Sequence, residues 1–433
     1  MAHASKIKGQ SLYVRHASKI VPWVGMAAMA ATVVIGLSLD WSGTQLGVPH
    51  PPFIGAYGPQ ANILELVTIP CFIAAVALVP WILRLKPALF GAALYVTTLI
   101  VRVTLNTGRG GTHQLDRALF VGPKGEGKNE YLPSLAAFDY GPRFVLDRFA
   151  ELVPSLPVHS AGHPPGLLLV MHYLALDTSP RLTAFILFVG AASAPLTYLL
   201  AKRLFDEDVA RIAGLLAAFA PAMLHFGATS ADAVYLTLGL LAAIPLLSNR
   251  VWLGALALAV VSLFAWSLLA VAAWAAILIW ARDGFKAAFR AGVIIGAVLL
   301  AFHALFALAT GFDPVGTLKA TSHVYEIGIA SRRPYAYWFF GSPTAFLLIL
   351  GVPIAWLALT GLGQRKPEAL AIFAVLAISC VLGFTKAETE RIWLFLAPLV
   401  ILCAAPLVRR PQLLIGVLAV QAVVYELLFD TLW

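Results

Sequence analysis

Long apolar runs separated by short polar connections dominate the chain. Most runs have about 20 residues, the length that an α-helix needs to cross the roughly 30 Å hydrocarbon core of a bilayer. We expect about 13 spanning helices, because the longest run divides into a closely spaced pair. The sequence therefore predicts an all-α integral membrane protein with one polytopic domain over residues 1–433. The runs cover residues 21–39, 62–83, 88–105, 182–201, 209–226, 231–248, 251–280 (the pair), 288–309, 342–362, 368–384, 392–408 and 411–428.

The composition agrees with a membrane protein. Apolar residues make up 60% of the 433 residues and charged residues 12%, whereas soluble proteins average roughly 45–50% and 25%. These proportions exclude a soluble enzyme, a disordered protein and a disulfide-rich secreted module. The three cysteines lie within apolar runs and indicate buried thiols. The net charge of +9 forms no basic patch, so we expect no nucleic acid as a partner.

The positions of lysine and arginine predict the orientation. Four basic residues precede the first run: Lys6, Lys8, Arg15 and Lys19. That run is longer than the core of a signal peptide, about 7–15 residues, so we interpret it as a span. A cytoplasmic N-terminus places the basic pairs of the short connections in the cytoplasm, as the positive-inside rule requires. We therefore expect a multi-pass protein of the cell membrane with residues 106–181 and 311–341 on the outer face.

The first outer segment, 106–181, contains two predicted surface helices. Between residues 143 and 153 the apolar and the charged side chains take opposite arcs of a helical wheel, which predicts an interfacial amphipathic helix. The apolar piece 166–176 is too short to cross the membrane, so we expect it to lie at the outer surface. Residues 311–341 are expected to form a second outer loop.

Ionisable residues at the predicted outer boundary form the candidate site, because burying charge there is costly unless it serves a function. A carboxylate can act as a general base toward a sugar hydroxyl, and arginine or lysine can hold a phosphate. The combination suits an enzyme whose donor is a sugar on a lipid phosphate. Four motifs carry these residues: the loop with Asp116, Asn129-Glu130-Tyr131 and Asp139-Tyr140; Ser160-Ala161-Gly162-His163-Pro164-Pro165; Thr229-Ser230-Ala231-Asp232; and Lys386-Ala387-Glu388-Thr389-Glu390-Arg391-Ile392-Trp393.

The order of the motifs carries a resemblance to a known family. Along the chain come Glu130-Tyr131, His163-Pro164-Pro165, a short apolar helix, a span ending in Lys202-Arg203-Leu204-Phe205, and Asp232. This order resembles the GT-C superfamily of polyprenyl-phosphate-sugar-dependent glycosyltransferases, in the branch of the lipid A aminoarabinose transferase and the protein O-mannosyltransferases. The resemblance covers about residues 88–250 and implies a GT-C-like bundle with juxtamembrane helices on the outer face. Residues 1–87 have no counterpart and are expected to form an added N-terminal helix hairpin.

The resemblance implies roles for individual residues. Glu130 matches an acid implicated in activating the acceptor, but Asn129 stands where the family has Asp, so Asp116 or Asp139 could be the base instead. Asp232 matches an acid that binds a metal in some members, so a divalent cation is the one cofactor that the resemblance allows. The other residues implied in substrate binding are Tyr131, His163, Glu390, Arg391, Arg332 and Arg333.

Each candidate also has a structural alternative. Glu130 is alternatively an exposed loop acid, and Asp232 caps the helix that follows it. His163 alternatively caps a short helix, and zinc binding with His159 is disfavoured because prolines interrupt the helix there. Basic residues beside aromatic ones are alternatively interfacial anchors; these are Arg332, Arg333 and Arg391.

Residues and resemblance together predict an inverting transferase that moves a sugar from a polyprenyl-phosphate-linked donor to an envelope glycan, lipid or protein acceptor. Membrane lipids are the other expected partners. Two alternative functions stay open. The first is a carrier for a lipid or small solute, which requires polar residues deep within several spans; His303 and Glu426 are the nearest cases. The second is an assembly scaffold without catalytic activity, which Asn129 favours.

Overall fold

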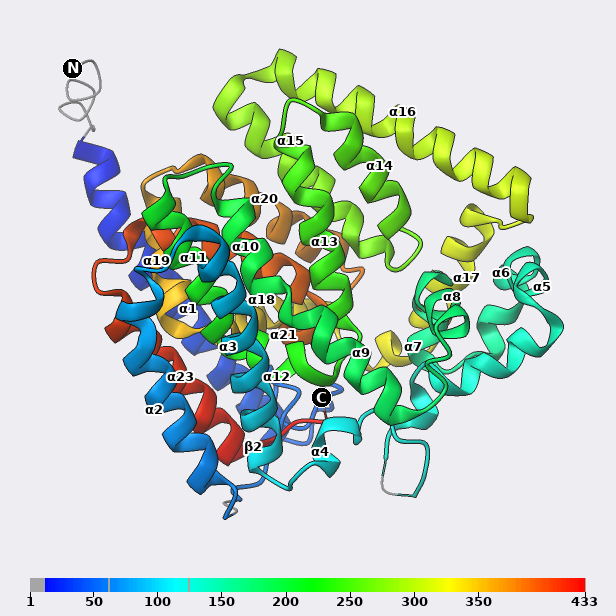
Figure 1. Cartoon of the computed structure of the whole chain (residues 1–433), viewed down its shortest axis with the longest axis horizontal. Coiled ribbons are helices and arrows are strands. Elements are labelled where there is room, and N and C mark those ends of the chain that lie inside the picture. The colour runs from blue at the N-terminus through cyan, green and yellow to red at the C-terminus, as the bar shows by residue number, and fades with distance from the viewer. Residues whose placement is uncertain (1–11, 61–62, 124, 433) are drawn as a thin grey trace.

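The computed structural model describes residues 12–60, 63–123 and 125–432, and almost every element in it is a helix (Figure 1). Lys6 and Lys8, which helped to predict the orientation, lie outside the described residues. Seven helical stretches of the described chain are long and apolar enough to cross a membrane. They are α1 (Leu12–Trp41), α2 (Glu65–Ile82), α3 (Pro87–Gly108), α9 (Ser179–Ala191) continued by α10 (Ser193–Ala201), η5 (Trp266–Leu269) continued by α15 (Ala270–Asp283), α16 (Phe285–Thr310) and α23 (Pro411–Leu428).

The other apolar helices are bent or short. Two bent pairs are α11 (Glu207–Phe219) with α12 (Pro221–Thr229), and α18 (Tyr335–Leu350) with α19 (Val352–Gly363). The short ones are α13 (Asp232–Leu246), α14 (Val251–Val261), α20 (Pro367–Leu382) and the stretch η7 (Leu394–Leu396), α22 (Ala397–Ala404) and η8 (Ala405–Leu407). Counting each bent pair as one span raises the number of candidate spans to nine among the described residues, and the expected 13 stays a prediction.

Both bends occur at residues that interrupt a helix. The bend between α11 and α12 is 59° and falls at Pro221, which has no backbone N–H to donate. The bend between α18 and α19 is 116° and falls at Gly351, whose φ of 140° suits glycine alone. The run 342–362 is therefore not the single straight span that the sequence predicted.

The first predicted outer segment, 106–181, folds into short helices. They are α4 (His113–Asp116), η2 (Gly127–Asn129), η3 (Leu132–Tyr140), α5 (Pro142–Asp147), α6 (Phe149–Leu152), η4 (Val153–Ser155), α7 (Val158–Ala161) and α8 (Gly166–Tyr173). The predicted amphipathic helix is interrupted at Arg148, between α5 and α6, but its apolar face is buried at Val145, Leu146 and Phe149. The second predicted surface helix is α8.

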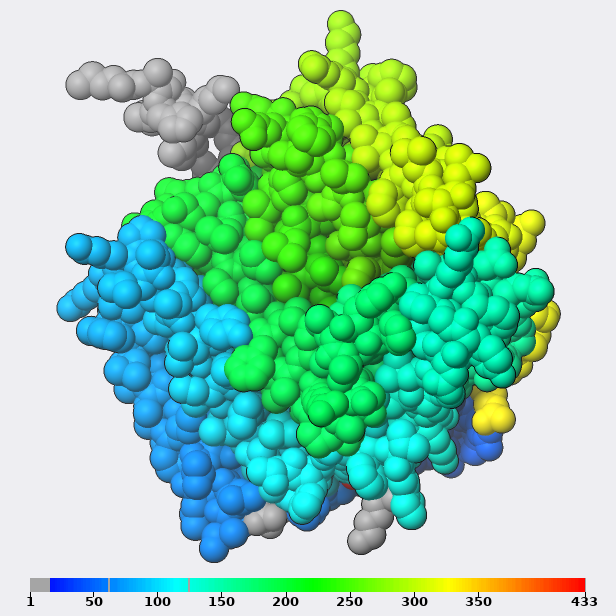
Figure 2. All heavy atoms as spheres, turned by 45° about the vertical axis from the view of Figure 1, so that its right-hand side comes forward, coloured from blue at the N-terminus to red at the C-terminus, as the bar shows by residue number. Residues whose placement is uncertain are grey.

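The second predicted outer segment, 311–341, is mostly helical. It contains α17 (Pro314–Ile327) and η6 (Ile329–Arg332), and α18 already begins at Tyr335. An Asp313 carboxylate caps α17 by accepting a hydrogen bond from the Gly316 N–H at 2.8 Å. α17 packs against α6 and η4, so the two outer segments meet, as the yellow and the cyan-to-green surfaces do in Figure 2.

The first two helices do not form the expected hairpin of residues 1–87. α1 packs against α18 and α19, whereas α2 packs against α3 and α23. The chain between α1 and α2 instead contains β1 (Ala56–Tyr57), which pairs antiparallel with β2 (Phe429–Asp430) after α23. The interior lies around α12 and α22, whose residues are all buried, while α16 is largely exposed.

Candidate functional site

Charged and polar side chains from five separate parts of the chain meet at one end of the helix bundle. They come from the turn between η2 and η3, from the residues after α7, from the first turn of α13, from the residue after η6, and from α21 (Thr389–Ile392) with the residue before it. We call this group the Arg391 cluster; its members are Glu130, Tyr131, His163, Asp232, Tyr235, Arg333, Glu388, Glu390 and Arg391. All are buried except His163, which is partly buried.

Arg391 connects two carboxylates. Its Nη1 donates to Asp232 Oδ2 at 2.8 Å, and its Nη2 donates to Glu388 Oε2 at 2.9 Å. Asp232 also accepts from the Ser230 hydroxyl at 2.6 Å and makes no side-chain cap of α13, so the alternative role as a helix cap is wrong. Burial alone lowers the pKa of Arg391, but Asp232 and Glu388 outweigh it and hold the guanidinium protonated.

Glu388 joins a second arginine to the cluster. Its Oε1 accepts a short hydrogen bond from Arg333, whose Nη1 also donates to the Lys386 carbonyl at 2.7 Å. Burial raises the pKa of Glu388, but Arg391 and Arg333 outweigh burial and lower it to about 2. Glu388 is therefore ionised and holds both guanidinium groups in place.

The backbone that carries Glu388 is strained. Ala387 has a φ of 64° and Glu388 a φ of 56°, both in the left-handed region that residues other than glycine rarely adopt. Such conformations cost about 1–3 kcal/mol each and are found mostly at functional sites. The two ion pairs of Glu388 offset this cost and fix the direction of its side chain.

A short chain of hydrogen bonds links the first outer segment to α13. The Tyr131 hydroxyl lies 2.8 Å from the Tyr235 hydroxyl and 3.2 Å from His163 Nδ1. His163 Nδ1 also lies 2.8 Å from the His159 carbonyl oxygen. A carbonyl oxygen can only accept, so Nδ1 carries a proton and Nε2 is the basic nitrogen of the neutral ring. Burial lowers the pKa of His163, which favours that neutral form.

Glu130 lies at the edge of the same cluster. Only 3% of this residue is exposed, so the alternative of an exposed loop acid is wrong. Its Oε1 lies 3.5 Å from His159 Nε2, and its charge is one of those that stabilise protonated Arg391. Burial raises the pKa of the neighbouring Tyr131, and the charge of Glu130 adds to that rise. Glu130 and Arg391, distant in sequence, are therefore electrostatically coupled.

Glu390 faces the loop between α1 and α2. Its Oε1 accepts from the Ile54 N–H at 2.7 Å, and its Oε2 has no hydrogen-bond partner among the described residues. Burial raises the pKa of Glu390 to about 7, although the Ile54 N–H favours the ionised form. The same loop accepts a bond from Trp338 Nε1 at the Leu46 carbonyl, at 3.0 Å. No motif in the sequence indicated that this loop reaches the site.

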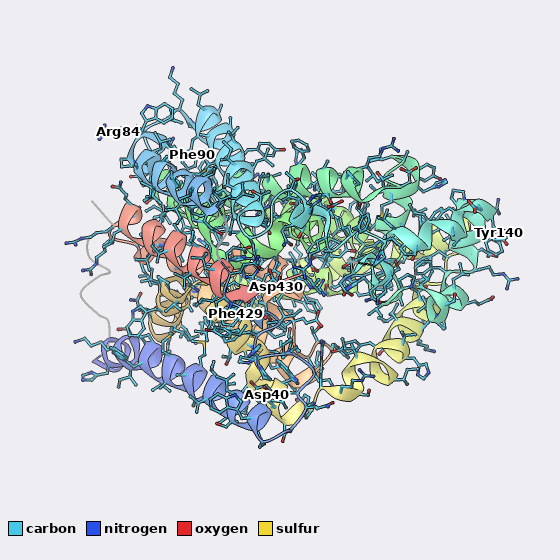
Figure 3. The ribbon with its side chains drawn as sticks, turned by 90° about the horizontal axis from the view of Figure 1, so that it is seen from below. Asp40, Arg84, Phe90, Tyr140, Phe429 and Asp430 are labelled. Atoms are coloured by element: carbon cyan, nitrogen blue, oxygen red, sulfur yellow. The ribbon has the colours of Figure 1, made fainter. Side chains whose placement is uncertain are left out.

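Three predicted site residues lie outside the Arg391 cluster. Asp116 is partly exposed in α4 and accepts from the Ser179 hydroxyl at 2.9 Å. Asp139 is exposed near the end of η3, next to Tyr140, which Figure 3 labels at the edge of the molecule. Arg332 is exposed in η6, whereas its neighbour Arg333 is buried. The structure therefore favours Glu130 over the two other candidate bases.

Of a second buried polar group, next to the cluster, sequence reasoning named only Glu426 and missed His225, Arg109 and Arg102. His225 Nδ1 lies 3.1 Å from Glu426 Oε2, and Arg109 donates to the Glu426 carbonyl at 2.8 Å. Arg102 is fully buried and donates to the Gly227 carbonyl at 2.8 Å and the Ser193 hydroxyl at 2.9 Å. An arginine within an apolar run is a signal that the sequence did offer, since charge inside a span is costly.

The side chains of the described residues do not form a metal site. Within the described part of the chain, no group of three or more His, Cys, Asp or Glu side chains could hold a metal ion. Asp232, the proposed ligand, is occupied by Arg391 and Ser230. The donor set therefore does not fit the divalent cation that the resemblance allowed.

Comparisons of the chain with protein-family models, with curated proteins and with solved structures find no match.

Proposed function

We propose that the chain is a membrane glycosyltransferase that moves a sugar from a polyprenyl-phosphate donor to a cell-envelope acceptor. One observation carries the proposal: Glu130, His163, Asp232 and Arg391, which come from the four motifs expected at one membrane boundary, lie in one cluster. Two arginines there, Arg333 and Arg391, oppose the carboxylates of Glu130, Asp232 and Glu388. Such a cluster supplies both a base and cations.

In the proposed reaction the acceptor hydroxyl attacks the anomeric carbon while its proton passes to Glu130. The bond from that carbon to the lipid phosphate breaks, and the phosphate leaves with the bonding electron pair. A positioned general base contributes typically 10²–10⁴-fold to such a rate. Burial of Glu130 beside His159 supports this role, because the base is fixed and shielded from bulk water.

Arg391 and Arg333 are the groups that would stabilise the departing phosphate. Both are held in place by Glu388 before any substrate binds, and preorganised charges of this kind are a large part of catalysis. Arg333 Nε is buried and has no hydrogen-bond partner within the described chain, and an unpartnered guanidinium donor is suited to a phosphate oxygen. Arg332 is exposed and is not needed for this step.

A carrier is the second candidate, and the buried ionisable groups within apolar helices favour it. Arg102, His225 and Glu426 are such groups. However, Arg102 lies six residues before the end of α3, about 9 Å along the axis, and Glu426 lies two residues before the end of α23. Both residues therefore lie near the end of the bundle that holds the Arg391 cluster. This position supports a binding site at one membrane face more than a transport pathway through the membrane.

The test is incubation of the purified full chain with a panel of labelled polyprenyl-phosphate sugars. We expect one donor to release its polyprenyl phosphate, with or without an acceptor present. Movement of an intact labelled donor or solute into sealed vesicles, with no cleavage of any donor, would establish the carrier instead. Binding of a donor with neither cleavage nor transport would support the scaffold that Asn129 suggested.

A further inference from the structure

A cavity of about 660 Å³ opens at the opposite end of α13 from the Arg391 cluster. Its walls come from the end of α13, the start of α14, the end of α15, the start of α16 and the turn after α10. Figure 1 shows α14, α15 and α16 together on one side of the molecule. Asp232 begins α13 and Leu246 ends it, which separates the two places by roughly 20 Å along the helix axis. The cavity therefore belongs to no part of the site described above.

Three arginines line this cavity: Arg203, Arg282 and Arg290. None of them forms an ion pair with a described carboxylate, whereas the nearby Lys202 and Arg211 both pair with Glu207. Asp283 is the one acid among the lining residues, and Ser248 and Asn249 add neutral polar groups. The lining thus has an excess of positive charge that its own side chains do not neutralise.

The other walls of the cavity are apolar and adjoin a surface suited to lipid. Leu246, Leu278 and Ile294 lie in the lining, and α16 exposes large apolar side chains along its length, including Leu300 and Leu308 at 75% and 85%. Aromatic residues mark the level of the opening, as they do where a membrane meets water: Trp252, Trp280, Phe285 and Phe289 are all more than half exposed.

We propose that this cavity binds the phosphate headgroup of an anionic membrane lipid. The arginine forks supply paired donors to phosphate oxygens, and the acyl chains lie along the exposed face of α16. In the predicted orientation these arginines face the cytoplasm, where anionic lipids attract basic residues. A lipid fits better than a free anion, because half of the lining is apolar and continues into the lipid-facing surface.

The test is titration of the purified full chain with phosphatidylglycerol or phosphatidylcholine, counting bound lipids by native mass spectrometry. The variant R203Q/R282Q/R290Q removes the three cavity arginines. Its matched control, R84Q/R409Q/R410Q, removes three exposed arginines from other connections on the same predicted side. We expect the cavity variant to bind phosphatidylglycerol at least about tenfold more weakly, since each basic residue near an anionic lipid contributes roughly fivefold, while the control and phosphatidylcholine binding stay unchanged.

Three results would overturn the lipid site. They are equal losses in the two triple variants, an unchanged affinity in the cavity variant, and displacement of the bound lipid by millimolar inorganic phosphate, which would indicate a free-anion site. If the cavity variant does not purify as a folded protein, R282Q and R290Q are measured singly against R409Q. Both side chains are exposed, and their single losses must again exceed that of the control.

Discussion

The pKa values of two glutamates that lie two residues apart are shifted in opposite directions. Glu388 accepts hydrogen bonds from two guanidinium groups, which keep it ionised despite its burial. Glu390 accepts one bond from the Ile54 N–H and has no arginine bonded to it among the described residues. Burial therefore dominates at Glu390 and raises its pKa to about 7, while the pKa of Glu388 falls to about 2. The two residues allow a matched pair of substitutions.

Glu388→Gln is expected to destabilise the protein by about 3–5 kcal/mol, since removing one partner of a buried ion pair leaves uncompensated charge. Glu390→Gln should not destabilise the protein at neutral pH, because the amide oxygen can still accept from Ile54 and no buried cation loses its partner. Thermal unfolding in detergent at neutral pH measures both. Equal destabilisation by the two substitutions would contradict the ion-pair geometry.

The pH dependence of Glu390 has a definite sign. Its pKa is 4.5 in the unfolded chain and about 7 in the fold, so the native state binds the proton more tightly. The contribution of this proton to the stability of the folded state is fully present below pH 4.5, and it is lost as the pH rises through about 7. We expect the unfolding temperature of Glu390→Gln to match the wild type near pH 5 and exceed it at pH 8. A constant difference between the two proteins over this range would show that Glu390 does not titrate there.

At the scale of single residues, the sequence distinguishes the candidate bases only in part. Glu130 and Asp139 occupy the same outer segment and carry the same charge, yet Glu130 is buried and Asp139 exposed. The difference depends on His159 and on Arg391, which approach Glu130 from other parts of the chain. The motif order correctly placed Asp232 and Arg391 near each other, but not their direct ion pair. Local sequence contains no information on that contact.

At the scale of elements, apolar runs predict helices well and bends poorly. The run 342–362 has the length of a span, but Gly351 and Pro353 divide it into α18 and α19. Proline is common in the first turn of a helix, and the apolar run continues without interruption across Pro353. Hydropathy therefore does not detect the break between the two helices. What reveals it is the φ of Gly351, a property of the folded backbone.

Gly351→Ala is expected to destabilise the protein by about 1–3 kcal/mol, because its φ of 140° is strained for any other residue. A Cβ there would also lie 2.5 Å from Leu418 Cδ2. Gly292→Ala in α16 is the control: nothing lies within 4 Å of its Cβ, and alanine is favoured in a helix by about 0.5–1 kcal/mol. Thermal unfolding of both variants measures the difference; equal unfolding temperatures would contradict the bend.

At the scale of the whole molecule, the two predicted outer segments form one unit because α17 packs against α6 and η4. A Cβ added at Gly316 would lie 3.4 Å from the Cβ of Ala150, close to the separation of a disulfide, about 3.5–4.5 Å. The Asp313 carboxylate, whose Oδ2 would overlap that Cβ, has to move aside in this variant. The double variant A150C/G316C should therefore form a disulfide under mild oxidation, seen as a shift in electrophoretic mobility that a reductant reverses. The two single variants are the controls, and a double variant that behaves as they do would contradict the packing.

The whole-molecule arrangement could be predicted only to the level of a helical membrane protein with its motifs at one end. The loop with Leu46 and Ile54 contains no ionisable motif, yet its backbone reaches both Trp338 and Glu390. Because a backbone N–H is present at almost every residue, sequence cannot indicate which one completes a site. The expected N-terminal hairpin failed for a related reason: many apolar surfaces suit α1, and packing selected α18 and α19.

The central claim is that Glu130 is the base of a sugar-transfer site built around Arg391. The most direct test compares the transfer rates of purified wild type, Glu130→Gln and Glu151→Gln with the donor that the panel identifies. Glu151 is an exposed acid of the same outer segment, paired only with exposed Arg148 in the described structure. We expect Glu130→Gln to lose about 10²–10⁴-fold in rate with an unchanged fold, and Glu151→Gln to match the wild type. A folded Glu130→Gln protein that transfers sugar at the wild-type rate would contradict the account.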